Sequence, residues 1–171
     1  MRVTFRVIHT ERLRLRRMHT GDAAFMLALL NQPSFIRNIG DRGARDLAGA
    51  RAYITDRVRA AYDRHGFGMY VVELKASGEP VGICGLVKRD SLPEVDIGYA
   101  LLERHWGRGY ALEAGRAVLA HAPNDIGLQR LLAITAPDNL PSMALLEKLG
   151  LRYQRLMQLP EGDSALFSLD F

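Results

Sequence analysis

Residues 102–111 read Leu102-Glu103-Arg104-His105-Trp106-Gly107-Arg108-Gly109-Tyr110-Ala111, and they carry the strongest structural signal in the chain. They follow a strand-like run, Val95 to Leu101, and open a helix-like run, Tyr110 to His121. The first N–H groups of a helix lack intrahelical partners, and the helix dipole places partial positive charge at the same end. The order of strand, glycine-containing turn and helix start therefore predicts an anion site built from the backbone.

The residue types in this turn indicate that the anion is a pyrophosphate. Gly107 and Gly109 permit the backbone angles and the close approach that a diphosphate requires. Arg104 and Arg108 add positive charge to the same turn. No Gly-Lys-Ser/Thr follows, and the third glycine of a dinucleotide fingerprint is absent, so neither of those phosphate loops fits. We expect the pyrophosphate to bind the backbone N–H groups of Gly107, Arg108, Gly109, Tyr110 and Ala111.

Length and composition favour one domain that spans residues 1–171. Of the 171 residues, 48% are hydrophobic, which is enough for a core. No run of 18 apolar residues predicts a membrane span, and the N-terminus Met1-Arg2-Val3-Thr4-Phe5-Arg6 lacks the apolar region of a signal peptide. Cys84 is the only cysteine, so no internal disulfide can form. We therefore expect a reducing, cytoplasmic location and a Cys84 that is buried in the core.

The basic character of the chain is spread along its length. The formal net charge is +4, and all but three of the 23 basic residues are arginine. The densest basic run, Arg12 to Arg17, alternates polar and apolar residues, which is typical of a strand with one solvated face. No concentrated basic stripe is present, so a nucleic-acid partner is not expected.

Hydrophobic periodicity and turn residues predict alternating strands and helices. Helices are expected from Thr20 or Asp22 to Pro33, from Asp46 to His65, and over 110–121 and 139–149, with a loop or short helical turn over 34–45. Strands are expected over 13–18, 69–74, 80–87, 94–102, 128–135, 151–159 and 165–171. This order predicts a mixed α/β (α+β) fold.

A second group of residues, Asn139 to Leu151, surrounds the last predicted helix. Asn139 is suited to cap the helix, because its side-chain oxygen can accept hydrogen bonds from free N–H groups of the first turn. Gly150 is suited to end the helix in a left-handed conformation. Each residue alone is explained by its role at a helix end. Their occurrence together, after the glycine turn, is more specific than either residue.

Together these segments resemble the GNAT superfamily of N-acyltransferases. Arg-x-x-Gly-x-Gly at residues 104–109 is similar to the acyl-CoA pyrophosphate loop of that family, and residues 139–151 are similar to its second signature. The opening Thr10-Glu11-Arg12-Leu13-Arg14-Leu15-Arg16 and the strand Asp96-Ile97-Gly98-Tyr99 resemble the RimJ/RimL-like branch, which contains ribosomal-protein N-terminal acetyltransferases. Two positions depart from the family pattern: Leu146 stands where many members have a tyrosine, and Leu151 where phenylalanine is usual.

The resemblance implies a GNAT fold with a central, mostly antiparallel twisted sheet that is flanked by helices. Its fourth and fifth strands would splay apart and admit the pantetheine arm of acetyl-CoA, the expected co-substrate. Backbone groups around Tyr99, Leu101 and Leu102 would then pair with the arm like an added strand. Asn139 is assigned to the cofactor side. The resemblance implies no metal, and it leaves a monomer or a homodimer open.

Acyl transfer from a thioester to an amine requires a base near the amine and a donor near the leaving thiolate. Asp96 is the best-placed carboxylate, because alternation along its strand puts it on the same face as Glu94. The alternative is that both carboxylates face solvent. His105, His121 and Glu73 are the other candidate bases, although His121 at a helix end has a structural explanation.

The resemblance places the Ser142 hydroxyl near the thioester sulfur. A capping or exposed serine is the structural alternative. We expect Trp106 to pack the helix against the sheet rather than to line the acceptor cleft. No activated nucleophile is visible, so direct transfer in a ternary complex is favoured over a covalent intermediate.

The expected activity is transfer of an acetyl group to a primary amine. The acceptor is a protein N-terminus or a small-molecule amine, and the residues do not choose between them. A non-catalytic acyl-CoA-binding module of the same fold is the alternative, because it would keep the glycine turn without needing Asp96 or Ser142.

Overall fold

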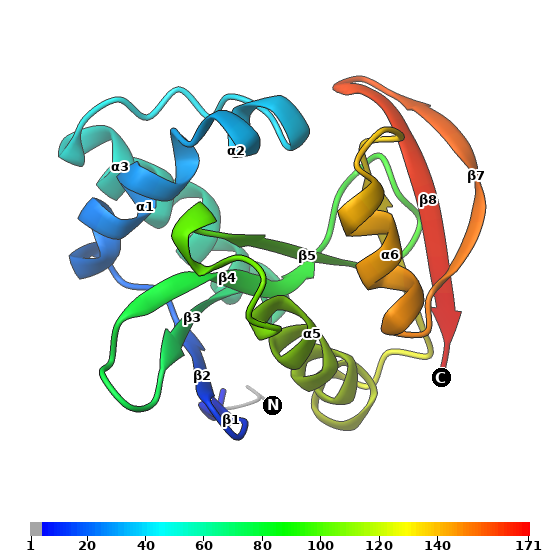
Figure 1. The fold of residues 1–171 in the computed structure, drawn as a ribbon, viewed down its shortest axis with the longest axis horizontal. Helices are drawn as coiled ribbons and strands as arrows, with labels where there is room; N and C mark the ends of the chain where they lie inside the picture. The colour runs from blue at the N-terminus through cyan, green and yellow to red at the C-terminus, as the bar shows by residue number, and fades with distance from the viewer. Residues whose placement is uncertain (1–4) are drawn as a thin grey trace.

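The computed structural model describes residues 5–171 and is built around an eight-stranded sheet (Figure 1). The strand order is β1-β2-β3-β4-β5-β6-β8-β7, and neighbouring strands are antiparallel except for the parallel pair β5 and β6. The strands are β1 (Ile8–His9), β2 (Leu13–Arg17), β3 (Met69–Leu74), β4 (Pro80–Val87), β5 (Asp96–Leu101), β6 (Arg130–Thr135), β7 (Arg152–Leu159) and β8 (Gly162–Asp170). Residues 1–4, which belong to the segment expected to lack a signal sequence, lie outside the described residues.

Helices cover both faces of the sheet. In Figure 1, α5 and α6 lie in front of the sheet, and the segment that runs through α3, η2 and α4 passes behind it. No helix within residues 5–171 is both long and apolar enough to cross a membrane. The helical segments are η1 (Thr20–Asp22), α1 (Ala23–Leu30), α2 (Pro33–Asn38), α3 (Leu47–Tyr53), η2 (Ile54–Arg59), α4 (Ala60–His65), η3 (Glu103–His105), α5 (Tyr110–His121), η4 (Ala122–Ile126) and α6 (Leu140–Lys148).

The predicted mixed α/β fold is confirmed, with three local differences. Pro33 does not only end α1; it also begins α2, because proline is well tolerated in the first turn, where its missing N–H has no helical partner. The expected helix after Asp46 is present but contains the π-helical turn η2, which no periodicity distinguishes from an α-helix. The two-residue strand β1 was not expected, because two residues show no alternation.

The fourth and fifth predicted strands, β5 and β6, splay apart as expected. Their register contains one pair, Asp96 with Leu132, and the Leu132 N–H donates to the Val95 carbonyl at 2.9 Å. Beyond this pair β5 continues to Leu101 along β4 alone. The side of β5 that faces β6 is therefore open beyond Ile97, and we call this opening the β5–β6 gap.

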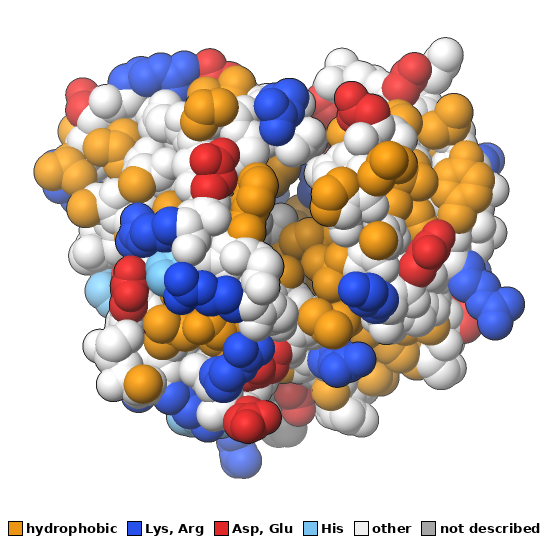
Figure 2. All heavy atoms as spheres, in the orientation of Figure 1, with side chains coloured by type: hydrophobic (Ala, Val, Ile, Leu, Met, Phe, Trp, Pro, Cys, Tyr) orange, Lys and Arg blue, Asp and Glu red, His pale blue; other side chains and the backbone are white. Residues whose placement is uncertain are grey.

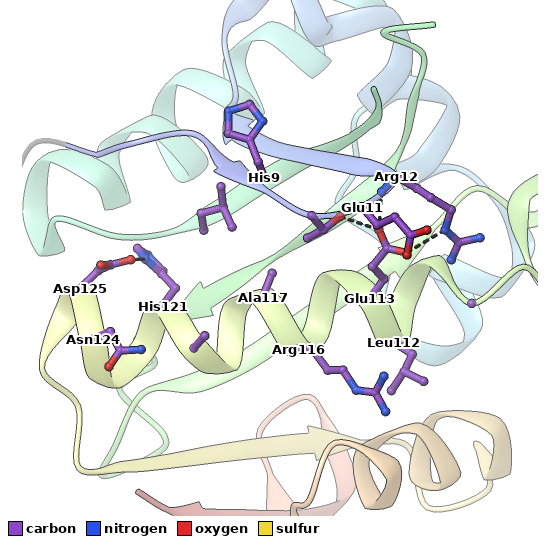
Figure 3. A pocket seen from close by; sticks show the side chains of 14 residues that line it. His9, Glu11, Arg12, Leu112, Glu113, Arg116, Ala117, His121, Asn124 and Asp125 are labelled. Carbon is purple, nitrogen blue, oxygen red and sulfur yellow. Dashed lines mark hydrogen bonds and ion pairs between the residues drawn. The ribbon is translucent and has the colours of Figure 1, made fainter. Parts of the chain in front are cut away.

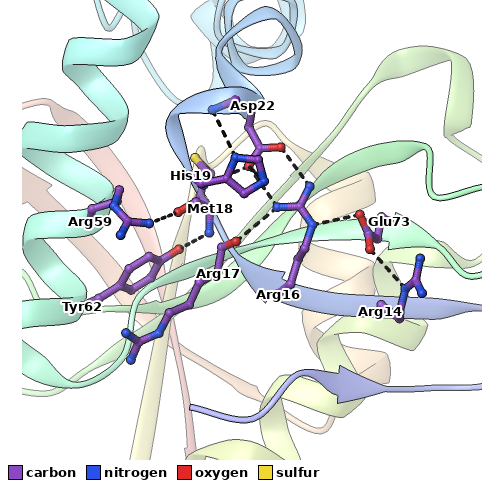
Figure 4. Close-up of polar contacts among 10 residues, drawn as sticks. Arg14, Arg16, Arg17, Met18, His19, Asp22, Arg59, Tyr62 and Glu73 are labelled. Carbon is purple, nitrogen blue, oxygen red and sulfur yellow. Dashed lines mark hydrogen bonds and ion pairs between the residues drawn. The ribbon is translucent and has the colours of Figure 1, made fainter. Parts of the chain in front are cut away.

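A buried ion network holds β2 against the start of the helical region (Figure 4). The Arg16 guanidinium donates to both Asp22 carboxylate oxygens, at 2.9 and 3.0 Å, and to Glu73 at 2.9 Å. Arg14 contacts the second Glu73 oxygen at 3.1 Å. The Asp22 side chain is 6% exposed and also accepts the His19 N–H at 3.0 Å. These contacts join β2, η1 and β3 through charges that are partly removed from water.

Removing the Asp22 carboxylate should destabilise the fold strongly. Asp22→Ala leaves the largely buried Arg16 guanidinium without one of its two anions, and we expect the free energy of unfolding to fall by about 3 kcal/mol. Urea unfolding measures this difference. The matched control is Asp41→Ala, which breaks the 2.5 Å pair with Arg45 at the surface and should leave the urea midpoint nearly unchanged.

The same pair predicts a pH dependence. Burial acts to raise the pKa of Asp22, but hydrogen bonds from Arg16 and from the His19 N–H outweigh it and hold this pKa below its ordinary value. The stabilisation is therefore complete above the unfolded pKa of about 3.9 and is lost as pH falls through the lower folded pKa. The stability difference between wild type and Asp22→Ala should be constant from about pH 7 to 5 and should shrink below about pH 4. A difference that persists unchanged at the lowest measurable pH would contradict this assignment.

Candidate active site

The glycine turn has the backbone geometry of an anion site. Gly107 and Gly109 have φ angles of 75° and 78°, in the left-handed region that favours glycine. The N–H of Glu113 makes the bond to Gly109 O at 3.1 Å that closes the first turn of α5. Within residues 5–171, no side chain caps this helix start. The preceding N–H groups of the turn and of α5 are thus directed outward at the positive end of the helix dipole.

The turn is anchored by the segment before β2, on the other side of α5 from α6 (Figure 3). The Glu113 carboxylate accepts the Arg12 N–H at 2.9 Å, the Arg12 Nε–H at 2.7 Å and the Thr10 hydroxyl. The Arg12 guanidinium also donates to the Arg108 carbonyl at 2.9 Å and lies 4.6 Å from the centre of the Tyr110 ring. Thr10 and Arg12, which stood out in the sequence without an assigned role, therefore fix the position of the glycine turn. A groove of about 710 Å³ runs along this side of α5, away from the β5–β6 gap.

A second anchor involves Glu79, at the end of the β3–β4 turn. One Glu79 oxygen lies 3.2 Å from Arg104 and 3.2 Å from His105 Nε2. Hydrogen bonds from Arg104 and then from His105 hold the pKa of Glu79 below its ordinary value. The Arg104 side chain is 63% exposed, so it contributes an ion-paired, solvated charge beside the turn.

The open edge of β5 presents alternate backbone groups to the β5–β6 gap. The Leu102 N–H donates to Val81 in β4, whereas the Val95 carbonyl accepts from Leu132 in β6. Backbone groups of an extended strand alternate in direction, so those of residues 99 and 101 point into the gap. Tyr99 and Leu101 are therefore placed to pair with an extended arm. Leu102 is not, because its N–H is taken by β4 and its carbonyl accepts the His105 N–H.

Two side chains that the sequence did not single out for this position contact the end of β5. The Leu101 carbonyl accepts from Gln32 Nε2 at 3.3 Å and from Trp106 Nε1 at 3.0 Å, which uses both of its lone pairs. The Gln32 side-chain oxygen accepts the Glu103 N–H at 2.8 Å. Trp106 is 53% exposed, so it lies on the surface beside the gap and does not pack the helix against the sheet as expected. The Leu101 N–H, rather than its carbonyl, is left for a ligand.

The first turn of α6 lies on the opposite side of the gap. Asn139 caps this helix, since its side-chain oxygen accepts the Ser142 N–H at 3.3 Å. The Ser142 hydroxyl is 2.6 Å from the Tyr99 hydroxyl, which comes from β5. Leu146, one helical turn after Ser142, is 1% exposed and belongs to the core. Two hydroxyl groups are thus present where the gap begins to widen.

Asp96 lies at the closed end of the gap and is 1% exposed, so it does not face solvent. One carboxylate oxygen accepts from Arg89 Nε at 2.9 Å, while the other has no hydrogen-bond partner among residues 5–171. Burial raises the pKa of Asp96 to about 6, against the opposing effect of Arg89. Asp96 is therefore a carboxylate at neutral pH with one oxygen available to accept a proton.

Of the other candidate bases, Glu73 and His121 have both polar side-chain atoms engaged, and His105 lies away from the paired end of β5. Both Glu73 oxygens are paired with arginines of β2. His121 contacts the Tyr70 hydroxyl at 3.0 Å through Nε2 and Asp125 at 2.7 Å through Nδ1. His105 is 5% exposed and lies by the glycine turn, with Nδ1 unpaired within the described part of the chain. Asp96 combines an available oxygen with a position at the gap, and the others do not.

Asp96 and Tyr99 point to opposite faces of the sheet, because they are three positions apart along the strand. Tyr99 faces α6, where Ser142 lies. Asp96 faces the side of Leu132, its partner in the β5–β6 pair, and Leu132 packs with Leu92 and Leu166. A hydroxyl and a carboxylate are thus placed at the gap from opposite faces. Figure 2 shows a crevice beside α6 whose walls carry hydrophobic side chains.

Comparison with known proteins agrees with this architecture. A family model described as Acetyltransferase (GNAT) domain matches residues 12–152. The uncharacterized protein YkkB of Bacillus subtilis (strain 168) is 32% identical over 152 residues, which cover 87% of each chain. An acetyltransferase from Agrobacterium tumefaciens str. C58 superposes with a TM-score of 0.84 and 26% identity, over 98% of this chain and 96% of that one. The ribosomal-protein-S5-alanine acetyltransferase of Vibrio fischeri shares the fold, with a TM-score of 0.80 and 17% identity over 97% of each chain.

The family model covers more than half of the chain, and it includes the glycine turn, the β5–β6 gap and α6. Acetyl-CoA is the co-substrate typical of this family, and the outward N–H groups of the turn fit its pyrophosphate. The chain therefore belongs to the GNAT family of N-acetyltransferases, which use acetyl-CoA, and its fold is that of the RimJ/RimL-like ribosomal-protein acetyltransferases.

Proposed function

We propose that this protein transfers the acetyl group of acetyl-CoA to a primary amine by direct attack in a ternary complex. The observation that supports this most strongly is the placement of Ser142 and Asp96 at the β5–β6 gap from opposite faces of the sheet. A thioester that lies in the gap would be accessible to an amine from the Asp96 side, while its sulfur leaves towards Ser142. Holding both reactants in one cleft replaces a bimolecular encounter by an oriented one.

The donor would be bound by backbone groups. The pyrophosphate binds the N–H groups of residues 107–111, with positive charge added by Arg104 and Arg108. The pantetheine arm pairs with Tyr99 and with the Leu101 N–H along the open edge of β5. Asn139 supports this site from the other side of the gap by fixing the first turn of α6.

The chemistry then needs one base and one hydrogen-bond donor. The neutral amine attacks the carbonyl carbon, and Asp96 accepts a proton from the nitrogen, directly or through water, as the new C–N bond forms. The C–S bond breaks with its electron pair going to sulfur, and Ser142 donates a hydrogen bond to the thiolate. Burial raises the pKa of the Cys84 thiol to about 12, which argues against an acetyl-cysteine intermediate.

The acceptor is proposed as a protein N-terminus or a small-molecule amine. A cytoplasmic location is consistent with the lone, buried Cys84. The expected independence from metal and the choice between monomer and homodimer stay predictions.

The first experiment is thiol release from acetyl-CoA with a panel of N-terminal peptides and small amines. Tight acetyl-CoA binding without release for any acceptor would favour a non-catalytic acyl-CoA-binding module.

Replacing Asp96 should change the pH profile as well as the rate. Asp96 must be ionised to act as a base, and its pKa is raised to about 6 by burial. An N-terminal amine must also be neutral, with a pKa of about 7.7 to 8. The logarithm of kcat/KM should therefore rise with slope two below about pH 6 and with slope one from there to the amine pKa.

Asp96→Asn should lower kcat/KM by about a hundredfold and should retain only the slope of one. The matched control is Asp170→Asn, at an exposed carboxylate that is paired with Arg130, and it should keep both slopes. If Asp96→Asn keeps the break near pH 6, another group is the base.

A methyl group at the glycine turn should weaken acetyl-CoA binding. Gly107 and Gly127 both have positive φ, 75° and 83°, and an added Cβ would meet nothing within 4 Å at either position. Alanine should therefore cost about the same backbone strain, on the order of 1 kcal/mol, at both sites. We expect Gly107→Ala to raise the acetyl-CoA Kd about tenfold, because the added methyl group keeps the pyrophosphate away from the backbone N–H groups. Gly127→Ala should leave the Kd unchanged. Titration calorimetry measures the Kd for acetyl-CoA, and thermal unfolding measures the backbone strain that both variants share. Equal Kd values would contradict a role of the turn in binding.

A further inference from the structure

The Tyr99 side chain connects the two sides of the β5–β6 gap. Its hydroxyl lies 2.6 Å from Ser142 Oγ and 3.2 Å from the Ser142 carbonyl. Tyr99 belongs to β5, and Ser142 belongs to α6, which follows β6. Among residues 5–171, the register of β5 and β6 contains the single pair Asp96 with Leu132. The phenol therefore reaches the group proposed to face the leaving sulfur. From the sequence, only the backbone of Tyr99 was expected to contact acetyl-CoA, and its hydroxyl had no assigned role.

Either hydroxyl can donate in the 2.6 Å contact, whereas the Ser142 carbonyl can only accept from the phenol. Burial raises the pKa of Tyr99 to about 12, although the hydrogen bond with Ser142 acts in the opposite direction. The phenol thus keeps its proton throughout the neutral pH range and can act as a donor. A serine hydroxyl has one hydrogen and two lone pairs. When the phenol donates to Ser142 Oγ, the Ser142 hydrogen is free to point elsewhere.

We propose that Tyr99 is a positioning residue, which acts through Ser142 by holding its hydroxyl hydrogen towards the sulfur of acetyl-CoA. This inference rests on the proposed function. As the C–S bond breaks, its electron pair moves to sulfur, and the negative charge is met by the Ser142 hydroxyl, which is itself polarised by the Tyr99 hydrogen bond. Neither hydroxyl loses its proton. The thiolate departs and is protonated by solvent, while the proton of the amine leaves through Asp96.

The bond to Ser142 also ties β5 to α6, so a purely structural role must be distinguished. If the hydrogen bond were only a structural tie, its loss would affect folding and acetyl-CoA binding. The effects of Tyr99→Phe and Ser142→Ala would then be additive. A positioning role acts on the charge of the sulfur and requires the serine hydroxyl. The decisive quantity is therefore the pKa of the thiol of CoA when it is bound, which reports hydrogen bonding to the thiolate without needing any acceptor amine.

The experiment titrates the thiol of bound CoA by the CoA-dependent thiolate absorbance, in wild type, Tyr99→Phe, Ser142→Ala and the double variant. We expect wild type to lower the pKa of the bound thiol by about one unit relative to free CoA, as one charge-assisted hydrogen bond would. Ser142→Ala should abolish this shift, Tyr99→Phe should remove most of it, and the double variant should match Ser142→Ala. Tyr153→Phe, at a half-exposed tyrosine on β7, is the matched control and should behave as wild type.

A second measurement uses turnover with any acceptor that the panel identifies. Tyr99→Phe should lower kcat about tenfold with the KM for acetyl-CoA within twofold, and it should have no further effect in the Ser142→Ala background. A wild-type-like thiol pKa in Tyr99→Phe, or additive effects of the two substitutions, would overturn the inference and leave the proposed function intact. Failure of the wild-type protein to bind CoA at all would overturn both.

Discussion

The early separation of β5 from β6 is the constraint on which the site depends. A sheet interior normally pairs every backbone N–H and C=O, because unpaired groups are costly when buried. Here the two parallel strands share the single register pair Asp96 with Leu132, and the edge of β5 beyond it is left open. An extended ligand that supplies the missing pairs would complete the sheet. The glycine turn and α5 follow this open edge directly, so the N–H groups proposed to bind the pyrophosphate lie at its end.

Three arginine side chains join the elements around the site through ion pairs and hydrogen bonds. Arg12 ties the glycine turn to the segment before β2 through Glu113, and Arg16 ties β2 to Asp22 and Glu73. Arg89 neutralises part of the charge of Asp96. Each guanidinium offers several donors in a fixed plane, which suits contacts between elements that are far apart in sequence. These three arginines therefore act within the fold, by joining its elements.

The sequence predicted the element order, the glycine turn and the N-cap at Asn139 because each depends on local chemistry. Positive φ at Gly107 and Gly109 and a side-chain cap in α6 involve residues within a few positions of one another. The roles of Gln32, Trp106 and the Tyr99 hydroxyl were not predicted, because their partners lie 69, 5 and 43 positions away and none follows a helical or strand period. The packing role expected for Trp106 was wrong although its partner is near in sequence. Its indole N–H donates to the Leu101 carbonyl, and its side chain lies on the surface.

By itself, the sequence determined the class of fold, the glycine turn before α5 and the family resemblance, because periodicity, turn chemistry and capping act over short distances along the chain. Only the tertiary structure decided which candidate groups meet. It placed Asp96 and Ser142 at one gap from opposite faces, and it engaged both Glu73 oxygens and both His121 nitrogens in other contacts. Burial raised the pKa of Asp96 to about 6. These properties arise from the packing of segments that are distant in sequence, and no local pattern encodes the distance between them.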